Sequence, residues 1–344
     1  MNNITHTLQA TVIKYCSTIG RDPLLVQGAG GNVSWKDDDT LWIKASGTWL
    51  VDAETKDIFI PVDLNDLRLE IAKRNFYAIP KVIGDSKLRP SIETLLHALL
   101  PHKVVVHLHA VEILAHLVRA NYVAVFKQLI DGSIKWCSVD YFKPGAELAE
   151  EVAASLLRQP DANVVFLQNH GVVIGGGGVS DIEIILQKLI TLLKNNMDPL
   201  LMGGSISVSP SLLQSQNYIL CSDPEVNQLA TNRYLSSRLE REWVLYPDHA
   251  VFLGDRAAIV GRTINLADLD AVSTNKPAFL FDVDTGVYIS KSATTAQKVQ
   301  LRCYYDVLIR QPVTEKLVAL PPASIAELLD WDAEKYRQTK CTEL

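Results

Sequence analysis

Apolar positions in the first two hundred residues follow two different spacings. Apolar side chains recur every three or four residues, the spacing of an amphipathic helix, over 7–19, 64–72, 147–158 and 180–196. Short, mainly apolar runs, typical of buried strands, occupy 104–108, 164–167 and 172–174, and a further strand is expected over 134–141. This part of the chain is therefore expected to contain both helices and strands.

A glycine- and serine-rich stretch, 202–210, interrupts the pattern and is the predicted linker. We place the domain boundary there, giving a domain over 1–204 and a smaller α/β domain over 205–344. In the second domain we expect helices over 223–242 and 294–310 and strands over 250–254, 257–260 and 278–289. The last strand segment should fold back at Asp284-Thr285-Gly286.

Composition and charge limit the classes of partner. The chain has 344 residues, 48% apolar and 21% charged, so it can bury a large core and form two domains. The formal net charge is −6 and no long Lys/Arg cluster is present, which argues against nucleic acid and membrane surfaces as partners. A small molecule is the expected partner.

The N-terminal segment, the length of the apolar runs and the spacing of the cysteines indicate where the protein is located and whether it contains disulfides. The N-terminus has neither a basic region nor an apolar core typical of a secretory signal, and no apolar run approaches the ~20 residues of a membrane span. We therefore expect a cytoplasmic protein. The five cysteines have no Cys-x-x-Cys spacing, which indicates neither a disulfide framework nor a thiolate metal site.

Two histidines at the end of an apolar run are the first candidates for chemistry. His107 and His109 follow Val104-Val105-Val106, and the period-two geometry of a strand places both on one face. Zinc accepts histidine nitrogens, and catalytic zinc sites use three protein ligands with one position left open. The candidate third ligand is His170, which follows the apolar run 163–167. We predict Zn²⁺, or another divalent metal, at these three histidines.

Four further motifs stand in a fixed order around the His-x-His pair. They are Gly-Asn-x-Ser, Ser-Gly, Ser-x-Glu and Asn-His-Gly, at 31–34, 46–47, 91–93 and 169–171. With the histidine pair they resemble the class II aldolase/adducin family over roughly residues 5–200. That family includes fuculose- and rhamnulose-phosphate aldolases, ribulose-phosphate epimerases and non-enzymatic adducin heads. The resemblance implies an α/β/α domain around a central, mainly antiparallel sheet.

The resemblance also implies a binding site for the substrate phosphate. The residues at the matching positions are Gly31, Asn32, Ser46, Gly47 and Ser91. From the residues alone, this glycine-rich turn is either a plain turn or an anion site made of backbone N–H groups. Ile92 stands where many family members carry a second serine, so one hydroxyl of the family pattern is missing.

Acid–base roles are likewise implied by the resemblance. Glu93 matches the carboxylate that moves protons, whereas from the residues alone it is also a first-turn helix acid favoured by the helix dipole. Tyr141, or Asp140 beside it, lies where these aldolases bring in a tyrosine from a neighbouring subunit. His97, one helical turn beyond Glu93, either supports the site from behind Glu93 or is a packing or solvent-exposed residue, and we expect the latter. Lys44 could line the pocket.

The predicted function is a zinc-dependent lyase that reversibly cleaves a ketose phosphate or related sugar by a retro-aldol reaction. A related enzyme keeps the metal but acts as an epimerase, dehydratase or decarboxylase, and a third alternative is a non-catalytic adducin-like scaffold. The resemblance implies a homo-oligomer, expected to be a tetramer. The region after 204 is similar to the segment that follows the aldolase domain in long rhamnulose-phosphate aldolase/dehydrogenase fusions, and its role is open.

Overall fold

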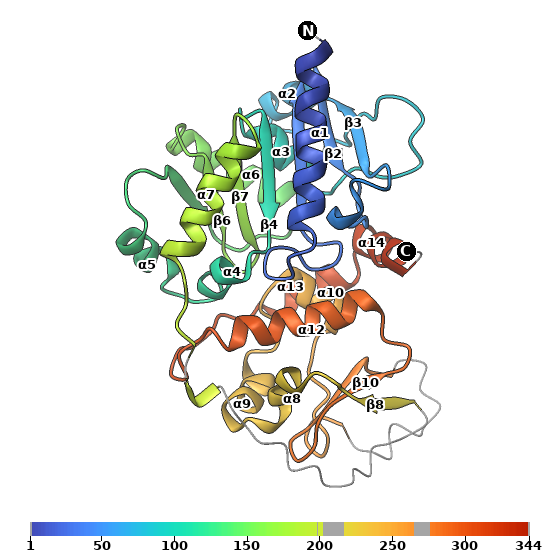
Figure 1. The fold of residues 1–344 in the computed structure, drawn as a ribbon, viewed down its shortest axis with the longest axis vertical. Coiled ribbons are helices and arrows are strands. Elements are labelled where there is room, and N and C mark those ends of the chain that lie inside the picture. The colour runs from blue at the N-terminus through green and yellow to red at the C-terminus, as the bar shows by residue number, and fades with distance from the viewer. Residues whose placement is uncertain (1, 198, 202–216, 265–275, 343–344) are drawn as a thin grey trace. The chain divides into compact units, whose positions relative to one another are not determined.

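A computed structural model describes residues 2–197, 199–201, 217–264 and 276–342 (Figure 1). The chain forms two compact units. Unit 1 comprises Met1–Leu117, Asn121–Lys194 and Trp331–Leu344, and unit 2 comprises Val118–Ala120 and Asn195–Asp330. The predicted linker 202–210, with the boundary at 204, lies outside the described residues.

Unit 1 is built on a seven-stranded sheet of order β3-β2-β1-β4-β7-β6-β5. The strands are β1 (Asn32–Asp37), β2 (Thr40–Lys44), β3 (Phe59–Asp63), β4 (Val104–Leu108), β5 (Trp136–Val139), β6 (Val164–Leu167) and β7 (Gly171–Gly176). Neighbouring strands are antiparallel except β5 and β6, which are parallel. The predicted α/β class with a mainly antiparallel sheet is confirmed.

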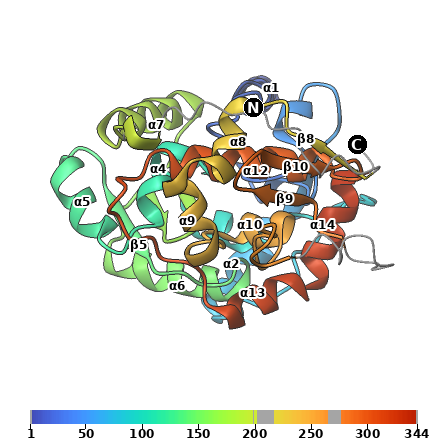
Figure 2. The same ribbon diagram turned by 90° about the horizontal axis from the view of Figure 1, so that it is seen from below.

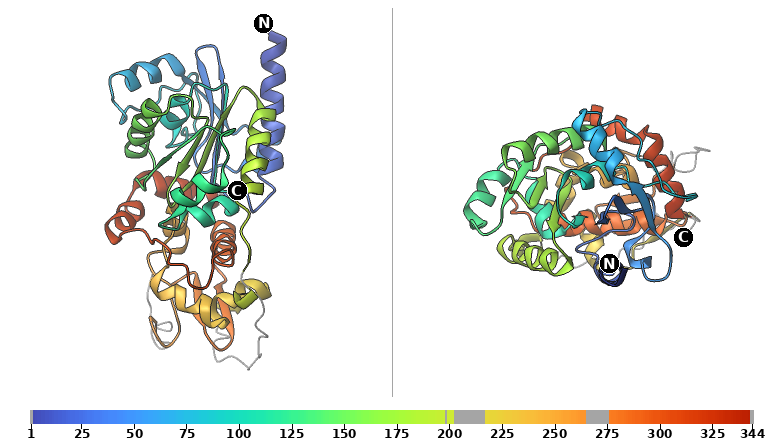
Figure 3. Two further views of the ribbon diagram at one scale, coloured as in Figure 1. Left: turned by 90° about the vertical axis from the view of Figure 1, so that its left-hand side faces the viewer. Right: turned by 90° about the horizontal axis from the view of Figure 1, so that it is seen from above.

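Helices cover both faces of this sheet (Figure 3). One face carries α1 (Asn2–Ile19) and α7 (Val179–Leu192), and the other carries α2 (Leu64–Ala72), α3 (Thr94–Leu99) and α6 (Ala146–Arg158). The remaining helices before residue 195 are α4 (Val111–Leu117), α5 (Tyr122–Leu129) and a short 3-10 turn, η1 (Leu50–Asp52).

Successive side chains of β4 pack alternately against the helices on the two faces of the sheet. Val104, Val106 and Leu108 pack with α1 and α7, whereas Val105 packs with α3 and α6. Because successive strand residues point to opposite faces, His107 shares the face of Val105. The first histidine of the pair therefore faces the α3 layer.

The starts of two helices in unit 1 are fixed in different ways. α7 begins at Val179 with Gly178 as its N-cap, one residue before the predicted start at 180, and no side chain caps it. α3 begins at Thr94, with Glu93 at its N-cap position. The turn before it is fixed by Ser91, whose Oγ accepts the Glu93 N–H and whose carbonyl accepts the Thr94 hydroxyl.

Unit 2 contains a three-stranded antiparallel sheet of order β8-β10-β9. The strands are β8 (Tyr218–Leu220), β9 (Phe279–Asp282) and β10 (Gly286–Ser290). The predicted reversal at 284–286 is confirmed, because it joins β9 to β10. The helices are α8 (Pro224–Thr231), α9 (Arg233–Arg241), α10 (Pro247–Leu253), α12 (Thr295–Leu308) and α13 (Pro322–Leu329); α8 packs on β9 and β10, and α12 packs on α8 and α10 (Figure 2).

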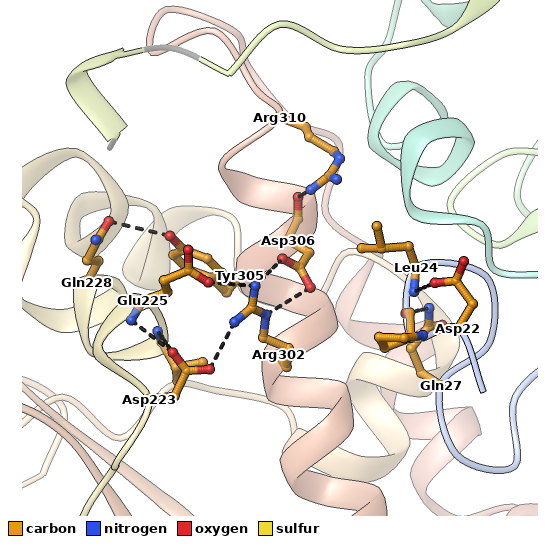
Figure 4. Close-up of polar contacts among 12 residues, drawn as sticks. Asp22, Leu24, Gln27, Asp223, Glu225, Gln228, Arg302, Tyr305, Asp306 and Arg310 are labelled. Atoms are coloured by element: carbon orange, nitrogen blue, oxygen red, sulfur yellow. Dashed lines mark hydrogen bonds and ion pairs between the residues drawn. The ribbon is translucent and has the colours of Figure 1, made fainter. Parts of the chain in front are cut away.

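An ion-pair cluster joins two helices of unit 2 (Figure 4). Arg302 of α12 contacts Asp306 on its own helix at 3.0 Å and reaches Asp223 at 2.9 Å and Glu225 at 2.7 Å. Asp223 is also the N-cap of α8, because its carboxylate accepts the Glu225 N–H. The cluster therefore fixes the start of α8 against α12.

Three predictions for unit 2 are wrong. The single helix 223–242 is divided at Asn232, which ends α8 and caps α9 through hydrogen bonds from the N–H groups of residues 234 and 235. The strand predicted at 250–254 is part of helix α10, which starts at Pro247, a residue suited to the first turn of a helix. Residues 257–260 form isolated bridges at Ile259 and Val260 instead of a strand.

The last described helix, α14 (Asp332–Thr342), belongs to unit 1. A Cβ atom on Gly47 would lie 2.6 Å from Cβ of Lys340, so α14 lies directly on the Ser46-Gly47 turn. The Arg89 guanidinium stacks 4.4 Å from the centre of the Tyr336 ring. The domain boundary predicted at residue 204 assigned this helix to the second domain, whereas the structure places it in unit 1.

Candidate metal centre and acid–base site

Three imidazoles meet at one edge of the unit 1 sheet. His107 is in β4, His109 follows that strand, and His170 lies in the turn between β6 and β7. All three side chains are buried, and their candidate ligand atoms lie within 4.8 Å of one another. The structure thus brings together the three histidines that the sequence selected.

The donor atoms fit a divalent metal. The Nε2 atoms of His107 and His109 are 3.1 Å apart. Zinc–nitrogen bonds of 2.0–2.1 Å place neighbouring ligands of a tetrahedral site roughly 3.3 Å apart. The His107 Nδ1–H donates to the Val172 carbonyl at 3.2 Å, which leaves Nε2 with the lone pair that a metal requires. The cluster is therefore suited to zinc or a similar cation.

The start of β7 and the end of β4 pass very close to each other beside the three histidines. Asn169 adopts a positive φ of 53° in the turn before His170. At Gly171, a Cβ atom would lie 2.4 Å from the Leu108 carbonyl oxygen and 3.1 Å from ring atoms of His107 and His109. Only glycine leaves room for the start of β7 to pass beside the two rings.

Glu93 lies directly beside the imidazoles. Its Oε2 is 3.6 Å from Nε2 of His107, its Oε1 is 3.6 Å from Nε2 of His170, and the residue is only 5% exposed. Burial raises the pKa of Glu93, but the electrostatic effect of His107 and His170 and a hydrogen bond from Asn32 lower that pKa to about 2. Glu93 is therefore an ionised carboxylate beside the candidate metal position.

A buried chain of polar side chains continues from Glu93. Asn32 Nδ2 donates to Glu93 Oε2 at 2.7 Å, and Asn32 Oδ1 forms a short hydrogen bond with His97 Nε2. His97 Nδ1 is in turn 2.7 Å from Ser34 Oγ. Burial lowers the pKa of His97 to about 3, so its ring is neutral.

This chain of hydrogen bonds was not predicted from the sequence. His97 was expected to be a packing or exposed residue, yet it is fully buried and hydrogen-bonded at both nitrogens. Its signal in the sequence was its position four residues after Glu93, on the same helix face. Asn32 was assigned to phosphate, but its amide is engaged with Glu93 and His97, so a phosphate contact of Asn32 stays a prediction.

The other residues assigned to phosphate form two adjoining turns. Gly31 and Gly47 both have positive φ, 63° and 80°, as the turn assignment requires. The Ser46 N–H donates to the Arg89 carbonyl at 2.9 Å, which ties its turn to the segment leading to Ser91. Their role toward phosphate stays a prediction.

A buried lysine joins the two glycine turns. Lys44 Nζ donates to the carbonyl of Ala29 at 3.2 Å and to that of Thr48 at 2.7 Å. The Lys44 carbonyl accepts the Ser91 N–H at 3.1 Å, so the same residue also holds the segment before α3. Lys44 is thus a structural link between the turns next to Glu93.

Tyr141 follows β5, which ends at the same edge of the sheet as β4 and β6. β5 pairs directly with β6, the strand before the turn that carries His170, whereas β6 and β7 separate it from β4, the strand of His107. A contact of Tyr141 with the site of a neighbouring subunit stays a prediction.

Comparison with known proteins gives matches to the first part of the chain. The family model "Class II Aldolase and Adducin N-terminal domain" matches residues 10–197. A Bacillus subtilis protein described as an uncharacterized oxidoreductase, YuxG, is 29% identical over 192 residues, which are 51% of this chain and 27% of that protein. The chain thus spans about a quarter of the length of that relative.

Solved structures also match this part. The N-terminal class II aldolase domain of a Thermoplasma acidophilum protein matches with 26% identity and a TM-score of 0.45, covering 54% of this chain and 91% of that one. A sugar-phosphate aldolase from Thermotoga maritima matches with 16% identity and a TM-score of 0.43, covering 56% and 95%. Among the described helices, none combines the length and apolar character of a membrane span.

Proposed function

The chain belongs to the class II aldolase and adducin N-terminal domain family, and from this premise we propose that it is a metal-dependent carbon–carbon lyase. Its reaction is the reversible retro-aldol cleavage of a ketose phosphate or related sugar. The observation that carries the proposal is the ionised Glu93 carboxylate, 3.6 Å from the ligand nitrogens of His107 and His170.

The chemistry needs stabilisation of negative charge. When a ketose is cleaved, the electrons of the broken carbon–carbon bond pass into the carbonyl group and leave an enediolate. A zinc ion held by His107, His109 and His170 would supply Lewis-acid stabilisation of that charge. The three imidazoles are neutral donors and leave room for an open coordination position.

Proton transfer is assigned to Glu93. In cleavage, the hydroxyl group on the carbon that becomes the aldehyde loses its proton, and the carbon of the enediolate gains one to give the ketone product. In the reverse direction the ionised Glu93 takes that proton from the carbon, and the new hydroxyl group gains one. Glu93 is ionised and buried, and among the described residues no hydrogen-bond partner meets its Oε1. This oxygen can accept and return the proton without first breaking a hydrogen bond.

The substrate and assembly follow from the family. Ser46, Gly47 and Ser91 are proposed to bind the anionic end of the substrate, supported by the adjacency of their turns to Glu93. The working unit is proposed to be a homotetramer, with Tyr141 of a neighbouring subunit near the site. A cytoplasmic location stays a prediction from the sequence.

A complete set of metal ligands with a carboxylate beside it disfavours the adducin-like scaffold, which needs neither.

The proposal is tested by identifying the products formed from a panel of ketose phosphates. They are followed with an assay coupled to dihydroxyacetone phosphate and by mass spectrometry. We expect cleavage into two shorter carbonyl compounds. A product that keeps every carbon and changes only configuration would replace the lyase with the epimerase, and loss of water or carbon dioxide would indicate the dehydratase or decarboxylase.

A further inference from the structure

The polar chain behind Glu93 comes from two elements whose geometry aligns it. Asn32 and Ser34 are two residues apart on β1, so their side chains share one face. Glu93 and His97 are separated by one turn at the start of α3. All four residues are buried, none more than 5% exposed. Buried polar groups of this kind have fixed partners, so the hydrogen-bond directions can be worked out.

The direction of each hydrogen bond follows from the Asn32 amide. Its NH₂ group donates to Glu93 Oε2, so its carbonyl Oδ1, which can only accept, faces His97. His97 must then carry its proton on Nε2 in order to donate to Oδ1. In a neutral ring Nδ1 is left as an acceptor, and it receives the Ser34 hydroxyl proton.

The chain of hydrogen bonds also makes the two carboxylate oxygens of Glu93 different from each other. Oε2 accepts from Asn32 at 2.7 Å, whereas Oε1 meets no hydrogen-bond partner among the described residues. A carboxylate with one oxygen held by a fixed amide cannot rotate freely about its terminal bond. In the structure the oxygen beside His170 is Oε1, the one without the Asn32 hydrogen bond.

We infer that His97, protonated on Nε2, is a positioning residue that holds the Asn32 amide and thereby aims Oε1 of Glu93 at the reacting carbon. This inference rests on the proposed function. His97 does not transfer the proton itself, because the Asn32 amide lies between the two groups. A histidine that served only to fill space would tolerate either tautomer and any side chain of similar volume.

Two amide substitutions separate these roles. In His97→Gln the side-chain amide can reach the position of Nε2 and donate to Asn32, whereas in His97→Asn the shorter amide reaches only the position of Nδ1. We expect His97→Gln to keep kcat within about threefold and His97→Asn to lower it by about 10- to 100-fold, the usual effect of removing a supporting hydrogen bond. KM and zinc content should stay unchanged in both. Equal kcat in the two variants would overturn the inference.

A spectroscopic test does not depend on turnover. Full-length protein labelled with ¹⁵N-histidine, with His97→Gln used to assign the signal, should show His97 as the Nε2–H tautomer between pH 5 and 8. An Nδ1–H tautomer or a cationic ring would overturn the inference even if the lyase activity is found. If the tautomer is as expected but no substrate is cleaved, the proposed function fails while the hydrogen-bond chain stands.

Discussion

Substitution of Gly171 by alanine should damage the metal centre without removing any ligand. The added Cβ atom would lie 2.4 Å from the Leu108 carbonyl oxygen, whereas ordinary contacts of this kind are 3.4 Å or longer. The start of β7 and the end of β4 must therefore separate by about 1 Å, and overpacking of a tight core costs about 1–3 kcal/mol. Backbone conformation adds nothing, because Gly171 is not among the glycines with positive φ.

The same methyl group would press on two of the proposed ligands. It would lie 3.1 Å from Cε1 of His107 and 3.1 Å from Cδ2 of His109, so both rings must move by a few tenths of an ångström. Metal–ligand distances tolerate only about 0.2 Å. We expect zinc affinity to fall by roughly 10- to 100-fold, the range found when the support of a ligand is disturbed.

Two measurements check this prediction against a matched control. Chemical denaturation of the metal-free protein gives the loss of stability, and competition with a chromogenic chelator gives the zinc affinity. Gly132→Ala is the control, because nothing lies within 4 Å of its added Cβ atom. If Gly171→Ala has the same denaturation midpoint as Gly132→Ala and binds zinc within twofold of it, the proposed close approach of β7 to the histidines is wrong.

Three further predictions concern single residues. Glu93→Gln should keep fold and metal, because its amide oxygen can still accept from Asn32, but lose at least ~10²-fold in kcat; near-normal turnover would move the base elsewhere. Asn232→Ala should cost about 0.5–2 kcal/mol in chemical denaturation by removing the cap of α9, whereas Asn232→Asp, which keeps the acceptor, should cost less; equal losses would argue against the cap. The folded-state pKa of His97, about 3, lies below its unfolded value of 6.5. The stability that the neutral His97 ring contributes to the folded protein is therefore fully present above pH 6.5 and is lost as the pH falls toward 3. Metal-free wild type should therefore lose up to ~1.4 kcal/mol per pH unit more than His97→Gln below pH 6.5, and parallel pH profiles would contradict the buried neutral ring.

Much of the candidate site follows from local spacing. The period of a strand placed His107 and His109 together, and the apolar run before His170 predicted a second strand that ends at the same edge. These two features depend on residues close together in the chain, which is why spacing alone could predict them. Glu93 was predicted by the resemblance of the five ordered motifs to the class II aldolase/adducin family.

The hydrogen-bond chain required information that local spacing does not hold. His97 meets Asn32 only because β1 pairs with β4 in the register that sets Asn32 opposite His107. The sequence contains both residues but not that register. For the same reason the engagement of the Asn32 amide with Glu93 could not be predicted.

The errors in unit 2 have a different origin. The apolar run 250–254 fits a buried strand and a buried helix equally well, because periodicity does not separate them in short segments. Pro247 at the first turn and Gly254 with a φ of 88° at the end define it as a helix. The return of α14 to unit 1 depends on packing between distant segments, which no local pattern reports.

Elemental analysis of protein from zinc-supplemented cells tests most directly whether His107, His109 and His170 form the metal centre of an enzyme. Wild type should contain about one divalent ion per chain, and His170→Ala should contain almost none while keeping the same circular dichroism spectrum. Metal-free wild type, or a His170→Ala variant that keeps its full metal content, would contradict the proposed site and the lyase chemistry built on it.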